Sequence, residues 1–250
     1  MFIHEYGSKE YPTVILLAPM MVSGEDIYNL MTPYIRGNYH IIAPDQGGHG
    51  NAGPYISAEK EYETLCVYLL EHHYTDIALL YGASLGVAVA YRLFLDPLFH
   101  ISKAWFDGVA FSRNAFLPEH MMRRLFYSRK KKLAKTHAEA SPSLVKVYGW
   151  EFARMMTRNF ERITRSDIDA ICHACCHYDL RKLTEEEQRK LHLDFGEKDY
   201  DLKYSRRTIP VYMPHVELKI RPGYSHCGYM AAHPKAYVEE IEAFARRGEQ

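Results

Sequence analysis

The sequence predicts an α/β fold in which a mostly parallel central sheet is flanked by helices and interrupted by an inserted helical segment. Three observations lead to this prediction. Short apolar runs typical of buried strands alternate with stretches of helical periodicity. One of these runs leads directly into a serine flanked by glycines, and a helical stretch follows it. Between about residues 112 and 190 the strand-like runs stop, and charged, helix-forming residues dominate.

The first part of the chain alternates between the two kinds of element. We expect a helix over 57–73, where apolar side chains recur on one face, and a second over 85–95, which ends at Asp96-Pro97. Short apolar runs predict four strands, which lie at 13–17, 39–43, 77–81 and 104–111. Strands that alternate with helices favour a parallel sheet covered on both faces.

The segment 112–190 has a different composition. From 113 to 165 it holds thirteen Lys and Arg residues against four Asp and Glu residues, and it contains three amphipathic stretches. Strand-like runs return at 190–195 and 216–220, and an amphipathic helix over 234–247 closes the chain. We therefore expect a core domain formed by 1–111 and 191–250, with 112–190 as a helical subdomain inserted into it.

Composition limits the classes of function. The formal net charge is zero, so the overall balance favours neither nucleic acid nor a membrane surface as a partner. No apolar stretch approaches the roughly 18 residues of a membrane span, and the N-terminal residues do not resemble a signal peptide. The five cysteines are an odd number and form no disulfide framework. These features predict a cytoplasmic protein with reduced thiols.

The segment Gly82-Ala83-Ser84-Leu85-Gly86 fits the G-x-S-x-G nucleophile elbow. An elbow is a sharp turn between a strand and a helix that exposes a serine in a strained conformation. The short pattern alone is weak evidence, since a glycine-containing turn can hold an incidental serine. The predicted strand before it and the predicted helix after it favour Ser84 as a nucleophile.

A serine nucleophile needs a base and a group that orients the base. His226 and Asp199 follow the last two predicted strands, so a parallel sheet would bring both to the edge where Ser84 lies. Asp199 is the preferred acid. Glu197 lies two residues away, and Asp107 at the end of another predicted strand is the main alternative.

The oxyanion of an acyl-transfer reaction needs two N–H donors aimed at it. The amide of Leu85 directly follows the nucleophile at the start of a helix and is one expected donor. The second should come from the loop after the first long strand, where we select the amide of Met20.

With these motifs in order, the chain resembles the α/β-hydrolase family along nearly its whole length. The resemblance rests on five segments: LLAPMMVSGEDI at 16–27, APDQGGHGN at 43–51, YGASLG at 81–86, DFGEKD at 194–199 and PGYSHCGYMAAHP at 222–234. It implies that Ser84, Asp199 and His226 form a catalytic triad and that 112–190 is a helical cap over the site. It also implies a structural role for the turn at Asp45, Gly48 and Gly50.

One departure from the family concerns the loop before the predicted oxyanion donor. Relatives usually carry His-Gly where this chain has Ala18-Pro19. Proline removes the N–H of residue 19 but leaves the amide of Met20 available. The loop is therefore expected to keep the donor and to differ in stiffness or shape.

Other motifs carry less weight. The segment 172–177 (CHACCH) contains possible zinc ligands, but no second ligand pair stands at a suitable spacing, so we predict no metal and interpret its cysteines as buried helix residues. Cys227 is expected to line the pocket.

The basic run 129–132 could steer an anionic substrate, although a solvated helix face is the more common role. No phosphate loop, dinucleotide motif or RNA-binding motif is present, so no cofactor and no nucleic-acid partner are expected.

These observations predict a serine hydrolase that cleaves a carboxylic ester, a thioester or a related acyl bond of a small molecule through an acyl-enzyme intermediate. The same triad would also serve an acyltransferase or a carbon–carbon bond hydrolase. A non-catalytic ligand-binding or scaffold protein of the same fold is the alternative from another class, and the departure at Ala18-Pro19 is the feature in its favour.

Overall fold

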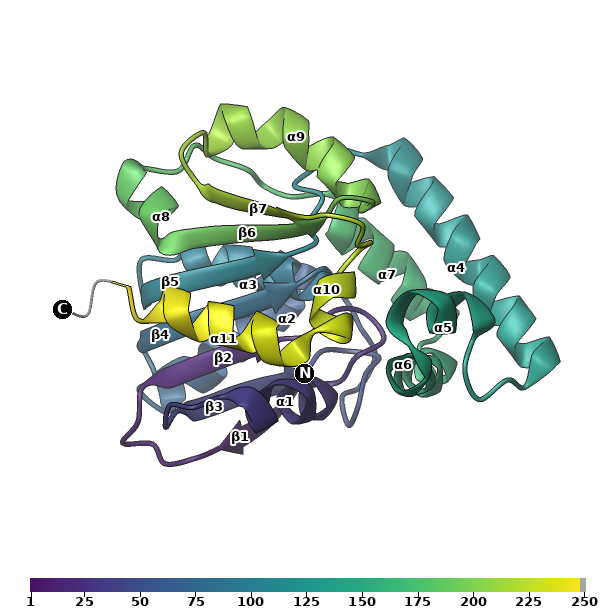
Figure 1. Ribbon diagram of the computed structural model, residues 1–250, viewed down its shortest axis with the longest axis horizontal. Coiled ribbons are helices and arrows are strands. Elements are labelled where there is room, and N and C mark those ends of the chain that lie inside the picture. The colour runs from purple at the N-terminus through teal and green to yellow at the C-terminus, as the bar shows by residue number, and fades with distance from the viewer. Residues whose placement is uncertain (248–250) are drawn as a thin grey trace.

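A seven-stranded sheet forms the centre of the molecule, whose computed structural model describes residues 1–247 (Figure 1). The strand order is β1-β3-β2-β4-β5-β6-β7, and only the edge strand β1 runs antiparallel to its neighbour, β3. The strands are β1 (Phe2–Tyr6), β2 (Thr13–Leu17), β3 (His40–Asp45), β4 (Asp76–Ala83), β5 (His100–Asp107), β6 (Leu191–Gly196) and β7 (Glu217–Arg221). The prediction of a mostly parallel sheet is confirmed.

The inner strands are buried along their length. Every residue of β2, β3 and β6 is buried, as expected for parallel strands with helices on both faces. The bounds predicted for β5 were wrong. The strand begins at His100 and ends at Asp107, whereas the predicted range was 104–111. The chain leaves the sheet at Gly108, whose φ of 63° is incompatible with an extended strand.

Helices cover both faces of the sheet (Figure 1). One face carries α2 (Ala58–Glu71) and α3 (Leu85–Leu95). The other face carries α1 (Gly24–Met31), α10 (Gly228–Ala232) and α11 (Pro234–Ala245). The bounds of α3 match the prediction, and Ser57 caps α2 by accepting a hydrogen bond from the amide of Lys60. Sequence periodicity did not predict α1, α10 or α9 (Tyr200–Tyr212).

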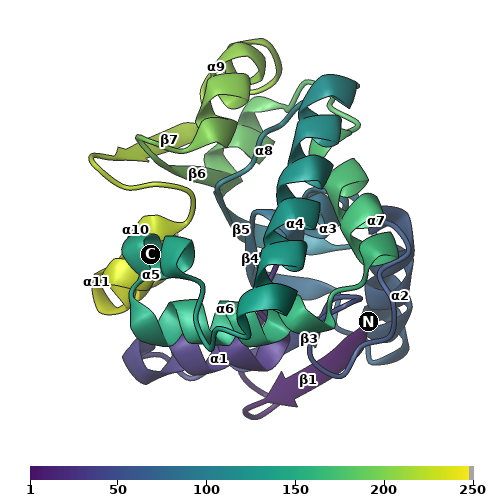
Figure 2. The ribbon, with the colours of Figure 1, turned by 90° about the vertical axis from the view of Figure 1, so that its right-hand side faces the viewer.

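Four helices lie beyond the carboxyl ends of the central strands (Figure 2). They are α4 (Phe116–Thr136), α5 (Pro142–Tyr148), α6 (Trp150–Arg162) and α7 (Arg165–Cys176), with α4 packed against α7. The next helix, α8 (Glu185–Lys190), packs instead against β5 and β6. Among residues 1–247, no helix combines the length and the apolar composition needed to cross a lipid bilayer.

Candidate active site

Ser84 lies at the turn between β4 and α3, in a strained backbone conformation. Its φ of 47° and ψ of −113° are unusual for a residue with a side chain, and its amide donates to the carbonyl of Asp107 at 2.8 Å. Both flanking glycines are sterically required. A Cβ on Gly86 would stand 2.1 Å from the carbonyl oxygen of Leu17, and one on Gly82 would stand 2.8 Å from the Cβ of Ala90. The local geometry is that of a nucleophile elbow.

His226 and Asp199 are in direct contact. His226 follows β7 and Asp199 follows β6, and the Nδ1 atom of His226 lies 3.0 and 3.1 Å from the two carboxylate oxygens of Asp199. The Asp199 side chain also accepts a hydrogen bond from the amide of Asp201, which fixes it at the start of α9. With Nδ1–H donating to the carboxylate, Nε2 of His226 is the nitrogen that can accept a proton.

The charge of Asp199 acts directly on this imidazole. Burial by itself would lower the pKa of His226, but the Asp199 carboxylate, through its charge and its hydrogen bond, outweighs it, and the pKa stands well above its ordinary value. The contact therefore both orients the ring and stabilises its protonated form.

The two alternative acids have other partners. Asp107 is buried, and its Oδ2 accepts a hydrogen bond from the Tyr237 hydroxyl at 2.8 Å. Burial, with the neighbouring charge of Asp194, raises the pKa of Asp107 to about 8, so this carboxyl holds its proton at neutral pH. The carboxylate of Glu197 accepts a hydrogen bond from the amide of Gly223.

A single cavity of about 580 Å³ connects the predicted site residues. Ser84, Asp199 and His226 all line it, and so does Met20. These four residues come from four loops that follow different strands, and all of those strands end at the same edge of the sheet. Leu85, the other predicted oxyanion donor, occupies the first position of α3, where an amide has no acceptor within its own helix.

The loop that carries Met20 is a tight turn. The amide of Val22 donates to the carbonyl of Pro19 at 3.2 Å, and Met21 between them has a φ of 71°. A positive φ at the third residue is characteristic of a type II turn. Pro19 is the first residue of this turn and takes part through its carbonyl, so the turn does not need the N–H that proline lacks. Ala18-Pro19 is therefore compatible with a compact loop at this position.

No family model matches this sequence, and no curated protein sequence does. Solved structures match it closely in three dimensions. An α/β-hydrolase family protein from Desulfitobacterium hafniense has a TM-score of 0.74 at 16% identity and covers 96% of this chain and 98% of its own. A comparable match is a carboxylesterase from Nitrososphaera gargenis, with a TM-score of 0.74 at 12% identity, which covers 97% of this chain and 93% of its own. Another is a bromoperoxidase from Bacillus anthracis, with a TM-score of 0.74 at 18% identity, which covers 97% of this chain and 94% of its own. The chain has the α/β-hydrolase fold.

Within this α/β-hydrolase fold, the turn after β3 supports the loop of Met20. The Nδ1 atom of His49 lies 2.9 Å from the carbonyl of Gly47, and its Nε2 lies 2.9 Å from the amide nitrogen of Met21. A neutral imidazole that donates from Nδ1 can accept at Nε2. Burial lowers the pKa of His49, which maintains that neutral form. The resemblance implied a structural role for this turn, and the contact of His49 with Met21 gives that role a physical form.

A second side chain of the same turn contacts the same loop. The side-chain amide of Gln46 donates to the carbonyl of Ala18 at 2.7 Å. Asp45 accepts hydrogen bonds from the amides of Gly24 and Asn51, both at 2.7 Å, and so fixes the start of α1 and the end of the turn. The turn and the loop before α1 therefore form one rigid unit beside Ser84.

The wall of the cavity facing the sheet comes from α4 and α7 and is mostly apolar. From α4 and α7 it includes Pro118, Met121, Met122, Leu125, Phe126 and Ile171. The prediction that Cys227 lines the pocket was wrong. Cys227 is buried next to the His226 ring, where a Cβ on Gly108 would touch both, while Cys175 and Cys176 line the cavity instead.

Asp201 is a cavity-lining residue that sequence analysis did not identify. One of its carboxylate oxygens lies 3.5 Å from Nδ1 of His226. Burial, together with the charge of Asp199, raises the pKa of Asp201 to about 6. No local pattern distinguishes Asp201 in the sequence, because its place depends on α9, which was not predicted.

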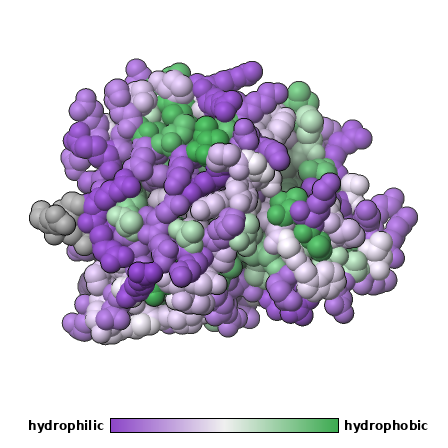
Figure 3. All heavy atoms as spheres, in the orientation of Figure 1, coloured by the Kyte–Doolittle hydropathy of each residue, from purple (hydrophilic) through white to green (hydrophobic). Residues whose placement is uncertain are grey.

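A separate groove of about 630 Å³ lies between α1 and α6. Figure 3 shows hydrophobic side chains gathered over α5 and α6 on this side of the molecule. The groove is lined by Leu30, Tyr148 and Phe152 among others, and it contains none of the predicted catalytic residues. Tyr148 also contacts the site directly, because its hydroxyl donates to the backbone carbonyl of His226 at 2.9 Å.

Proposed function

We propose that this protein is a serine hydrolase that cleaves a carboxylic ester by way of an acyl-enzyme. The observation that carries the proposal is the shared cavity. Ser84, in an elbow geometry, lines the same cavity as His226, whose Nδ1 contacts Asp199 at 3.0 Å. A reactive hydroxyl, a base and an oriented acid are the parts that acyl transfer by serine requires.

In the first half of the proposed reaction, the Ser84 Oγ attacks the carbonyl carbon of the ester, and Nε2 of His226 takes the hydroxyl proton. Asp199 stabilises the resulting imidazolium. The amides of Met20 and Leu85 donate to the oxyanion, each expected to contribute about 3 kcal/mol of transition-state stabilisation. His226 then gives its proton to the leaving alcohol, and the acyl group stays on Ser84.

In the second half, His226 accepts a proton from water, which attacks the acyl-enzyme and releases the acid. This half distinguishes a hydrolase from an acyltransferase, in which another acceptor replaces water. The carboxylesterase from Nitrososphaera gargenis, which shares the fold, supports an ester as the substrate class. A thioester or a related acyl compound would undergo the same steps.

The lining of the cavity favours an uncharged acyl group. Side chains of α4 and α7, including Met121, Leu125 and Ile171, provide apolar contacts of the kind that bind alkyl or aryl groups. We propose that the segment 112–190, which contributes these helices, acts as a cap that determines acyl preference. Lys198 and Tyr204 also line the cavity and add polar contacts.

A covalent probe tests the proposed function. A fluorophosphonate should label the intact protein and fail to label Ser84→Ala. Ser225→Ala is the matched control, because Ser225 lines the same cavity but lies outside the elbow, and it should label normally. Folding of each variant is checked by circular dichroism. If the folded, intact protein takes no label, Ser84 is not an activated nucleophile.

Hydrolysis assays then address the substrate. A series of p-nitrophenyl esters with increasing acyl length should show release that depends on Ser84, with a preference for uncharged chains over chains that end in a carboxylate. Equal rates for charged and uncharged chains would contradict the role assigned to the apolar lining.

A further inference from the structure

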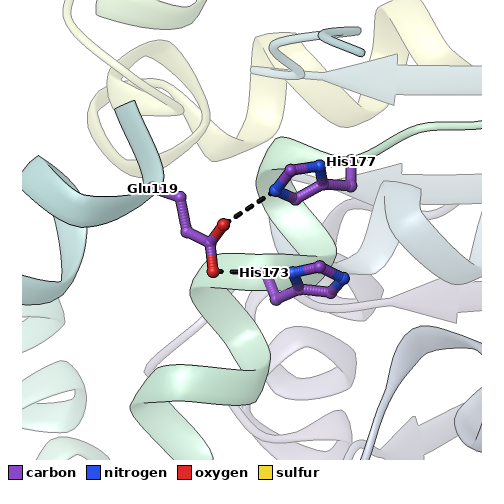
Figure 4. A group of neighbouring side chains, drawn as sticks. All are labelled: Glu119, His173 and His177. Atoms are coloured by element: carbon purple, nitrogen blue, oxygen red, sulfur yellow. Dashed lines mark hydrogen bonds and ion pairs between the residues drawn. The ribbon is translucent and has the colours of Figure 1, made fainter. Parts of the chain in front are cut away.

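Three side chains, from α4 and from the end of α7, converge on one another (Figure 4). None of them lines the cavity that contains Ser84, Asp199 and His226. Glu119 comes from the first turn of α4, and His173 and His177 come from the last turn of α7 and the residue that follows it. Nε2 of His177 lies 2.7 Å from one oxygen of the Glu119 carboxylate, and Nδ1 of His173 lies 3.5 Å from the other. One ligand atom from each residue lies within 4.8 Å of the other two.

The two histidines are held in register by the helix. Residues four apart lie on the same face of a helix, and the rings of His173 and His177 stack with centroids 4.3 Å apart and planes inclined by 24°. Both rings direct a nitrogen toward the same carboxylate (Figure 4). At its other end α7 begins with a capping box at Thr164, and it packs against α4, so the backbone that carries both histidines is ordered before a ligand binds.

These three side chains offer ligand atoms of the kinds that bind transition metals. Two imidazole nitrogens and one carboxylate oxygen are a common three-ligand set for Zn²⁺, with water in the fourth position. Glu119 and His177 are mostly buried, while the side chain of His173 is 59% exposed. The exposed side gives a metal ion and its water a path from solvent.

The two oxygens of the Glu119 carboxylate have different neighbours. Arg123 donates to Oε1, and its guanidinium also lies near Asp169. Oε2 is then the oxygen that faces His177 and is available to a metal. Ligands on a tetrahedral zinc ion stand about 3.3 Å apart at bond lengths near 2.0–2.1 Å. The 2.7 Å contact between Oε2 and His177 must therefore open slightly, and the exposed ring of His173 must move inward.

We propose that Glu119, His173 and His177 form a binding site for a divalent transition metal, with Zn²⁺ as the probe ion, and that the metal links α4 to α7. The two helices are the ones that line the apolar wall of the cavity. An ion here would hold that wall in one arrangement. The expectation of no metal in the segment 172–177 rested on the absence of a second ligand pair at a suitable spacing along the chain, whereas the proposed third ligand is the single residue Glu119 of α4.

Metal titration of the full-length protein tests the site. After chelator treatment and dialysis, zinc binding is measured by competition with a chromophoric chelator. We expect one equivalent to bind in the micromolar range, and His173→Ala or His177→Ala to weaken it at least about tenfold. His120→Ala removes an exposed histidine of α4 outside the cluster and should leave binding unchanged. Substitution of Co²⁺ should give the visible absorption bands of a tetrahedral site in the intact protein and not in His177→Ala.

A stability measurement keeps the test independent of activity. Zinc should raise the melting temperature of the intact protein and of His120→Ala, but not that of His173→Ala. A second cluster, formed by Asp199, Asp201 and His226, is the competing location. Binding that survives His173→Ala and is lost in His226→Ala would overturn the proposal, and so would the absence of any binding at micromolar zinc.

Discussion

Nε2 of His49 lies 2.9 Å from the amide nitrogen of Met21, so a histidine of one loop fixes the backbone of another, 28 residues earlier in the chain. The residue before Met21 is the proposed oxyanion donor. An amide can stabilise an oxyanion only if it is aimed before the charge develops. The contact therefore makes His49 a positioning residue for the proposed reaction, although it is absent from the lining of the cavity.

We predict that His49→Ala lowers kcat about 10²-fold with little change in KM, because the loss falls on the transition state rather than on substrate binding. His49→Gln retains an acceptor and should recover part of the rate. His72→Ala, which changes an exposed histidine at the end of α2, is the control. A rise in KM with kcat unchanged would indicate a role in binding instead.

The buried carboxyl of Asp107 gives a prediction about stability and pH. Its pKa is raised to about 8 in the folded protein, against about 3.9 in an unfolded chain. Between these values the folded state binds more protons than the unfolded state, so this group makes the free energy of unfolding decrease as pH rises. The slope from one such group is at most about 1.4 kcal/mol per pH unit.

The variant Asp107→Asn removes that titration. We expect urea denaturation curves measured between pH 5 and pH 8 to show a smaller loss of stability in Asp107→Asn than in the intact protein. The variant should also keep its fluorophosphonate labelling, since Asp107 contacts Tyr237 rather than the imidazole of His226. Loss of labelling in a folded Asp107→Asn protein would instead favour Asp107 as the acid of the triad.

Much of the sheet was predictable because buried parallel strands are continuous apolar runs, and the run at 13–17 coincides with β2. The edge strand β1 mixes polar and apolar residues and gives no such signal. The helix α9 was missed for a related reason, since its sequence is largely polar and contains Pro210. Local periodicity detects an element only where burial imposes it.

Some residues of the site could also be grouped from the sequence, and other contacts could not. Ser84, Asp199 and His226 each follow a strand, and the topology of a parallel sheet brings strand ends together, so the sequence sufficed to group them. The contact of His49 with Met21 and that of Glu119 with His177 depend on how separate elements pack. No spacing along the chain encodes such contacts.

Asp199 should control both the rate and its dependence on pH. A neutral His226 is needed to accept the serine proton, and its pKa is raised well above the ordinary value by Asp199. In the intact protein the rate should therefore increase with pH until it passes the pKa of His226. In Asp199→Asn this increase should shift to lower pH, and the plateau of kcat should fall by about 10³–10⁴.

Asp201→Asn is the matched comparison for Asp199→Asn, because Asp201 lies 3.5 Å from the same nitrogen, beyond hydrogen-bond range for a strong contact. Its effect on the plateau should be much smaller. A pH–rate profile of ester hydrolysis for all three proteins distinguishes the two carboxylates. Equal losses of kcat in both variants would mean that the acid is shared.

Gly86, two residues after the proposed nucleophile, gives the sharpest prediction about stability. A methyl group at Gly86 would stand 2.1 Å from the carbonyl oxygen and 2.6 Å from the carbonyl carbon of Leu17, and backbone atoms of a central strand cannot move aside. Gly86→Ala should therefore destabilise the fold by more than about 3 kcal/mol or prevent folding. Gly53→Ala adds the same methyl group where no atom lies within 4 Å, and it should change stability by less than about 1 kcal/mol. Urea denaturation of the two variants measures the difference. Equal stabilities would show that β2 and α3 can separate at the elbow, and the strained geometry assigned to Ser84 would then lose its structural basis.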